Sequence, residues 1–183
     1  MESLRGKLLV AGPRLVDPNF RRTVVLVGAH GEEGAMGIVL NRPSPVSVQE
    51  AVPPLSGLDG LAGGDEPVYV GGPVQPEAIV VLGEFAEPEA AGAVVFDAVG
   101  FLPGETGPDD VPALLRSRVY AGYAGWGPGQ LERELEEESW IVEPALADDV
   151  FTDVPDRLWS VVLDRKGGPF SVLAMMPPDP SLN

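Results

Sequence analysis

Short runs of apolar residues, each interrupted by glycine or proline, are the main pattern along this chain. The stretch Lys7–Ala11 is one such run, and residues 23–27 (TVVLV) are β-branched and apolar throughout, as is typical of a strand buried on both faces. Residues 31–34 (GEEG) then turn the chain, and residues 36–40 (MGIVL) return it. Because this connection is so short, residues 23–27 and 36–40 are predicted to be antiparallel neighbours in one sheet.

The same kind of run predicts further short strands. They cover residues 68–70, 78–82, 94–96, 119–121 and 140–142. Among the helices, the sequence SVQE at residues 47–50 has capping-box spacing and predicts a short helix that stops before Pro53. A second helix is predicted to be capped by Asp109 or Asp110 and to run through Arg118.

Two further helices have clearer periodicity. Residues 128–138 place Leu131 and Leu135 four positions apart on one face, and residues 155–166 begin with proline and are followed by Gly167 as a C-cap. Strands outnumber helices, and the helices are interspersed among them. This pattern predicts a mixed, mainly antiparallel β-sheet flanked by helices, of the α/β class with α+β as the borderline alternative.

Length and composition fit one globular domain. The chain has 183 residues, and 44% of them are hydrophobic, which is enough to enclose a core. We expect residues 1–176 to form a single compact domain with a glycine-rich loop at residues 57–64, and residues 177–183 to form a flexible proline-rich tail. Because the chain has no run of about 18 apolar residues and no recognisable secretory signal, we expect a cytoplasmic protein without membrane contact.

Charge and residue counts exclude several kinds of site. Lys+Arg 12 against Asp+Glu 28 gives a formal net charge of −16, which disfavours direct nucleic-acid binding. Without cysteine and with a single histidine, His30, the chain has no metal site built on several His or Cys ligands. No nucleophile-elbow motif is present, so we predict no catalytic residue, no metal and no cofactor. A turn-capping or salt-bridged His30 is favoured over a general base.

The stretch GYAGWGPGQLERELEEESW at residues 122–140 resembles a phosphate-binding loop at first sight, because glycines precede a predicted helix. A Walker loop would continue with lysine and then serine or threonine, whereas Gln130-Leu131-Glu132 stands here, and a dinucleotide fingerprint would need glycine in place of Gln130. The five glutamates that follow would also repel a phosphate. We therefore predict a strand-to-helix corner with Trp126 in the core.

One group of polar residues lies next to the apolar strands and could form a small pocket for an anion or carbonyl ligand. The candidate residues are Asp17, Asn19, Arg22, Thr23, Asn41 and Arg42, with Gln75 and Trp126 as further members. In this hypothesis Arg22 or Arg42 is the bidentate donor. The alternative, which we prefer, is a structural network in which these side chains satisfy backbone groups of the turns.

Four segments occur together in an order and spacing that are jointly specific. They are GKLLVAGPRLVDPNFRRTVVLV, HGEEGAMGIVLNRP, VYVGGPVQP and GYAGWGPGQLERELEEESW, and together they span nearly the whole chain. The chain resembles the YqgE/AlgH family of small bacterial proteins. The resemblance implies a single-domain α/β fold with a mixed sheet and no established activity, so no catalytic residue is carried over. Members often have Glu-His where Ala29-His30 stands, and many have histidine at Gly83, so this chain lacks part of that polar set.

Two functions remain open on the sequence alone. The family label of transcriptional regulator comes from a genetic link to exopolysaccharide control. Together with the acidic composition, it implies a cytoplasmic regulator that acts on transcription indirectly, through a protein partner. The alternative is a small-molecule binding protein or weak enzyme, with its pocket near the DPNF and NRP motifs.

Overall fold

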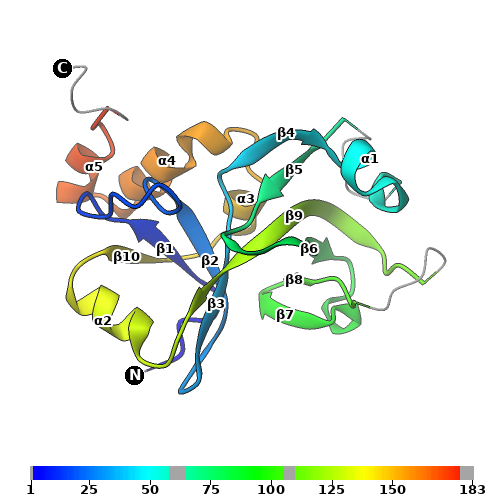
Figure 1. Cartoon of the computed structure of the whole chain (residues 1–183), viewed down its shortest axis with the longest axis horizontal. Helices are drawn as coiled ribbons and strands as arrows, with labels where there is room; N and C mark the ends of the chain where they lie inside the picture. Colours follow the sequence, from blue (N-terminus) through cyan, green and yellow to red (C-terminus); the bar gives the residue numbers. More distant parts are fainter. Residues whose placement is uncertain (1, 58–64, 105–109, 178–183) are drawn as a thin grey trace.

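The computed structural model describes residues 2–57, 65–104 and 110–177 (Figure 1). Residues 58–64 of the loop predicted at 57–64, the predicted cap Asp109, and residues 178–183 of the tail predicted at 177–183 lie outside these ranges. The described part is an α+β arrangement of one mainly antiparallel sheet with short helices. Its strands are β1 Lys7–Ala11, β2 Val24–Gly31, β3 Gly34–Val39, β4 Pro43–Ser47, β5 Pro67–Val70, β6 Val74–Phe85, β7 Ala93–Phe96, β8 Val99–Phe101, β9 Leu114–Trp126 and β10 Trp140–Pro144.

Helices are short and lie between the strands. They are α1 Val48–Ala51, α2 Gln130–Glu136, α3 Ala147–Val150, α4 Leu158–Lys166 and α5 Pro169–Leu173, with 3-10 turns at Pro53–Leu55, Pro88–Ala90 and Pro155–Arg157. The Ser47 hydroxyl accepts a hydrogen bond from the Glu50 N–H at 3.2 Å, which confirms the predicted cap of α1. None of the described helices has both the length and the apolar character needed to cross a membrane.

The long strand β9 joins two halves of the sheet. The strand order is β10-β1-β2-β3-β9-β6-β8-β7, while β4 and β5 branch from β9 through a parallel β5–β9 pairing. In Figure 1, β1, β2 and β10 with α2, α4 and α5 lie on one side of β9, and β6, β7 and β8 lie on the other. The two ends of the strand order approach each other, since the Arg5 guanidinium just before β1 donates to the Val94 carbonyl in β7.

The first half of β2 is buried on both faces, as its apolar run predicts. Val24 and Leu26 belong to a cluster that includes residues of α4, whereas Val25 and Val27 belong to a second cluster that includes Trp126 and residues of α2 and β10. All four side chains are fully buried. The antiparallel pairing of β2 with β3 confirms the predicted hairpin, and the two-sided burial makes this strand the centre of the fold.

The predicted helix ending at Arg118 is wrong, because residues 114–126 form the single strand β9. This strand alternates in burial and pairs antiparallel with β6, including Val80↔Tyr120 and Leu82↔Arg118. These pairings outweigh the local capping signal that predicts a helix. Sheet pairing over many residues overrides a weak helix start. The structure also adds β4, β8, α3 and α5, none of which the pattern predicts, and extends β6 beyond residues 78–82.

Candidate functional site

Arg42 holds the turn at residues 17–21 through its backbone carbonyls. Its Nη1 donates to the carbonyl oxygens of Pro18 at 2.7 Å and Asn19 at 2.9 Å, and its Nη2 donates to that of Arg21 at 2.8 Å. The Asp17 carboxylate accepts from the Asn19 N–H at 2.8 Å. Burial lowers the pKa of Arg42, and the nearby charge of Asp17 opposes this shift. This part of the predicted cluster is the structural network of the preferred alternative.

Asn41 and Thr23 also bond to backbone groups. The Asn41 Oδ1 accepts from the Val24 N–H at 3.0 Å, and its Nδ2 donates to the Arg22 carbonyl at 2.9 Å. The buried Thr23 hydroxyl donates to the Phe20 carbonyl at 2.6 Å. Both side chains therefore fix the path by which the turn enters β2, rather than pointing at a ligand.

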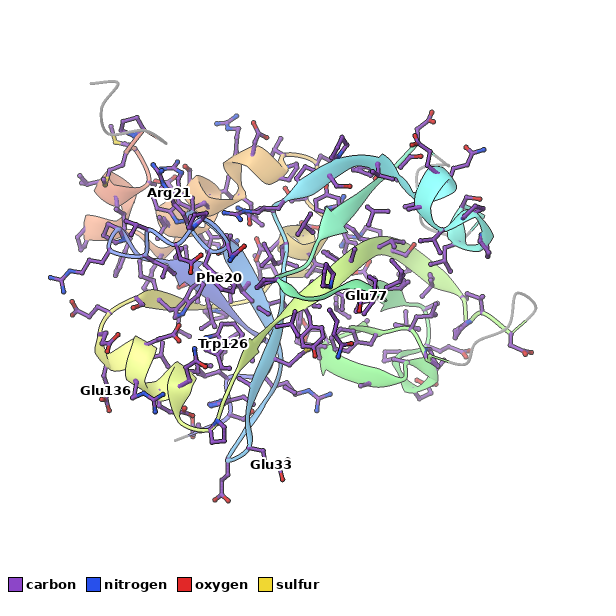
Figure 2. The ribbon with its side chains drawn as sticks, in the orientation of Figure 1. Phe20, Arg21, Glu33, Glu77, Trp126 and Glu136 are labelled. Carbon is purple, nitrogen blue, oxygen red and sulfur yellow. The ribbon has the colours of Figure 1, made fainter. Side chains whose placement is uncertain are left out.

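Two of the predicted residues lie apart from this network. Gln75 is exposed, with a positive φ of 43°. Trp126 is 6% exposed and its Nε1 donates to the Glu134 carboxylate at 3.2 Å, which confirms its predicted place in the core. Figure 2 shows Trp126 below Phe20, and the two rings are 6.3 Å apart. Asn19 and Arg42 line a hollow of about 50 Å³, which Gln75 and Trp126 do not line.

Arg22 lines a different and larger cavity, which we call the arginine pocket. Its guanidinium lies over the Trp159 ring, 4.0 Å from the ring centroid, and its Nη1 donates to the Met176 carbonyl at 3.0 Å. The pocket has a volume of about 270 Å³. Its lining residues are Gly12, Pro13, Leu15, Val16, Arg21, Arg22, Trp159, Leu173, Met176 and Pro177. The structure thus separates Arg22 from the rest of the predicted cluster.

A second cavity, which we call the β10 groove, lies beside the last strand of the sheet. Its volume is about 610 Å³. Its lining residues are Pro13, Arg14, Leu135, Glu138, Trp140, Ile141, Val142, Lys166, Pro169, Phe170 and Leu173. They come from α2, β10, α4, α5 and the segment after β1, so the groove runs along a strand edge between helices.

The register of β10 shows which of its backbone groups face the groove. Bonds from Gly12 N to Ser139 O at 2.8 Å and from Ala145 N to Gly6 O at 3.4 Å flank the β1–β10 ladder. Because antiparallel hydrogen bonding alternates, the backbone groups of Trp140 and Val142 point away from β1. The Val142 carbonyl accepts from Lys166 Nζ at 3.1 Å. The Trp140 N–H and C=O and the Val142 N–H therefore form a short open edge.

His30 is bonded through both of its ring nitrogens. Its Nδ1 accepts from the Leu4 N–H at 3.0 Å, so its Nε2 carries the proton that is donated to the Glu132 carboxylate at 2.6 Å. This hydrogen bond lowers the pKa of Glu132. His30 therefore pairs with a carboxylate through a hydrogen bond rather than through the predicted salt bridge, and its partner lies on α2 rather than in the adjacent turn. Over the described ranges, no group of three or more His, Cys, Asp or Glu residues could hold a metal ion.

The family profile described as AlgH-like matches residues 8–171. This chain belongs to the AlgH-like family. The AlgH-like chain is 45% identical over 190 residues to a UPF0301 protein of Streptomyces coelicolor, covering 100% of this chain and 97% of the relative. It is 40% identical over 189 residues to a UPF0301 protein of Chlorobaculum tepidum, covering 97% and 95%.

Two solved structures share the AlgH-like fold. The crystal structure of protein DIP2367 from Corynebacterium diphtheriae has a TM-score of 0.86 at 27% identity, covering 96% of this chain and 94% of that one. The solution structure of AlgH from Pseudomonas aeruginosa has a TM-score of 0.72 at 30% identity, covering 96% and 95%. These matches confirm the resemblance and the α+β fold. Their names describe a family and no activity, so a function has to be argued from the geometry.

Proposed function

We propose that this AlgH-like protein is a cytoplasmic regulator that acts on transcription indirectly, by binding a partner protein along the β10 groove. The observation that supports this proposal is the open edge of β10, where the Trp140 N–H and C=O and the Val142 N–H point away from β1. An extended segment can add to such an edge through backbone hydrogen bonds, while side-chain pockets select its sequence.

The groove walls suit an extended segment with apolar side chains. Leu135 of α2 and Phe170 and Leu173 of α5 line the cavity, and all three side chains are only partly buried. Lys166 crosses from α4 to the Val142 carbonyl and the Glu143 carboxylate, so it limits strand addition to the first part of β10. The docked segment would therefore be short, with its apolar residues against these walls.

Charge decides which partner we propose. The chain carries a net charge of −16, which steers it toward a partner of positive net charge. Glu138 lines the groove where it meets α2, next to Glu136 and Glu137 in the sequence, and Arg14 and Lys166 also line it. Proteins that bind DNA are themselves basic. The partner would thus be a basic DNA-binding protein, with a cationic residue of its docked segment facing Glu138.

Photo-cross-linking in living cells tests this proposal. A photoreactive amino acid at Phe170, inside the groove, should cross-link to a basic DNA-binding protein. The same amino acid at Leu115 is the matched control, since Leu115 is 61% exposed on β9 and does not line the groove. A stoichiometric partner captured from Leu115 and not from Phe170 would contradict the proposal.

The purified partner then allows a test of the strand edge. Val142→Pro removes the outward N–H while leaving the bonds that face β1, and proline is tolerated on edge strands. We expect affinity to fall at least about tenfold, because a backbone hydrogen bond and the local strand geometry are lost. Unchanged affinity would rule out strand addition at β10. Salt-sensitive binding of duplex DNA by this protein alone, at near-physiological salt, would refute the indirect action.

A further inference from the structure

The arginine pocket contains an unusual backbone conformation. Arg22 has a φ of 57°, in the left-handed region that few non-glycine residues adopt. The Asn41 Nδ2 donates to the Arg22 carbonyl at 2.9 Å, and the next residue after Arg22, Thr23, is fully buried. Non-glycine residues in this region are enriched at ligand sites, where the surrounding structure maintains them. Here the strained backbone places a guanidinium 4.0 Å from the centroid of the Trp159 ring, at the wall of a cavity.

Among the described residues, the lining of this cavity is basic, although the chain as a whole is acidic. Arg21 and Arg22 both line it, and no Asp or Glu is among the described residues of its lining, although the chain carries 28 acidic residues. Burial lowers the pKa of Arg22, and the charge of Arg21 lowers it further. A ligand carboxylate beside the Arg22 guanidinium would be attracted by Arg22 and by the nearby charge of Arg21. Figure 2 shows Arg21 on the side of the molecule that carries α4 and α5.

The remaining walls are apolar. Leu15, Val16, Leu173 and Met176 line the cavity, and the Trp159 Nε1 already donates to the Ala11 carbonyl at 2.9 Å, so the indole offers its ring rather than its N–H. A volume of about 270 Å³ admits only a small molecule. Such walls suit a ligand with one compact charged end and an apolar body, and they do not suit a highly hydrated polyanion.

We propose that the arginine pocket binds a small organic monocarboxylate, with its carboxylate held by Arg21 and Arg22 and its apolar body against Val16 and Met176. The planar guanidinium fork matches a carboxylate, which it can bind through two parallel hydrogen bonds. Within the described residues, the Arg22 guanidinium donates to Met176 through Nη1, which leaves further N–H groups for a ligand. This site adjoins the β10 groove, with which it shares Pro13 and Leu173, but neither Arg22 nor Trp159 lines the groove, so either proposal can fail without the other.

Titration of the full-length protein with defined acids tests the site. The probes are hexanoate, benzoate and phenylacetate, with hexanamide as the uncharged control and inorganic phosphate as the anion without an apolar body. Tryptophan fluorescence and ¹⁵N–¹H NMR shifts report binding. We expect saturable binding of at least one acid, with amide shifts at Arg21, Arg22 and the Trp159 indole. Equal binding of hexanamide, or phosphate binding tighter than every acid, would overturn the proposal.

Variants connect the binding to the named residues. Arg22→Ala should weaken binding of the preferred acid at least about tenfold, and Arg22→Lys should weaken it less, because lysine keeps the charge and loses the fork. Val16→Glu is a second variant that does not disturb packing, since Val16 is 73% exposed, and its carboxylate should repel the ligand. Arg133→Ala, at an exposed position on α2, is the matched control and should bind normally. Unchanged affinity in both Arg22→Ala and Val16→Glu would refute the site.

Discussion

Arg22 precedes β2 and Arg42 follows β3, so the two arginines flank the open end of the same hairpin, yet the structure gives their side chains different surroundings. Arg42 directs three hydrogen bonds at backbone carbonyls of the turn at residues 17–21. Arg22 lies over Trp159 and lines a cavity. An arginine whose N–H groups donate to backbone carbonyls of the protein stabilises the fold. An arginine at a cavity wall can instead donate to a ligand. Two arginines in one polar cluster can therefore have separate roles.

Arg42→Ala should produce the largest loss of stability. Three carbonyls lose a charged donor, and because they are partly exposed, water replaces some of these bonds, so we expect the free energy of unfolding to fall by about 2–3 kcal/mol. Arg22→Ala should cost less than about 1 kcal/mol, mainly through its lost contact with Trp159. Urea denaturation measures both. A larger loss in Arg22→Ala than in Arg42→Ala would reverse the comparison.

Asn41→Ala should have an intermediate effect on stability, because the Asn41 side chain bonds to the backbone of Arg22 and Val24. It leaves the buried Val24 N–H without its acceptor and releases the Arg22 carbonyl, for an expected loss of about 1–2 kcal/mol. Hydrogen exchange of the Val24 amide should become faster in this variant. Asn41→Asp is the control, because its carboxylate can still accept from Val24. Unchanged exchange at Val24 in Asn41→Ala would show that this bond is not needed in solution.

The sequence allows the central hairpin, the helices α2 and α4 and the buried Trp126 to be predicted, because each depends on local periodicity or capping. It does not allow β9 to be predicted between residues 114 and 118, where pairing with β6, which lies 29 to 36 residues earlier in the chain, decides the conformation. The motifs do place Asp17, Asn19 and Arg42 together. They cannot separate Arg22 from them, because that depends on one backbone φ angle.

The two cavities have no comparable signal in the sequence. Trp159 of α4 and Met176, which follows α5, contact Arg22 from more than 130 residues away in the chain. The open edge of β10 depends on its place at the end of the strand order, which is set by its pairing with β1, a strand more than 120 residues earlier in the chain. Side-chain periodicity predicts which elements form, whereas the site depends on how distant elements meet.

The smallest predicted effect isolates the backbone of Arg22 from its side chain. At a φ of 57°, glycine is unstrained and alanine is not, so Arg22→Gly should be more stable than Arg22→Ala by about 1 kcal/mol. Arg21 is the matched control, because it is not among the residues with positive φ. At that position the order should reverse, with alanine more stable than glycine by about 0.4–1 kcal/mol. Thermal or urea unfolding of the four variants measures both differences. If glycine and alanine ranked in the same order at residues 21 and 22, the left-handed conformation that places Arg22 at its pocket would not persist in solution.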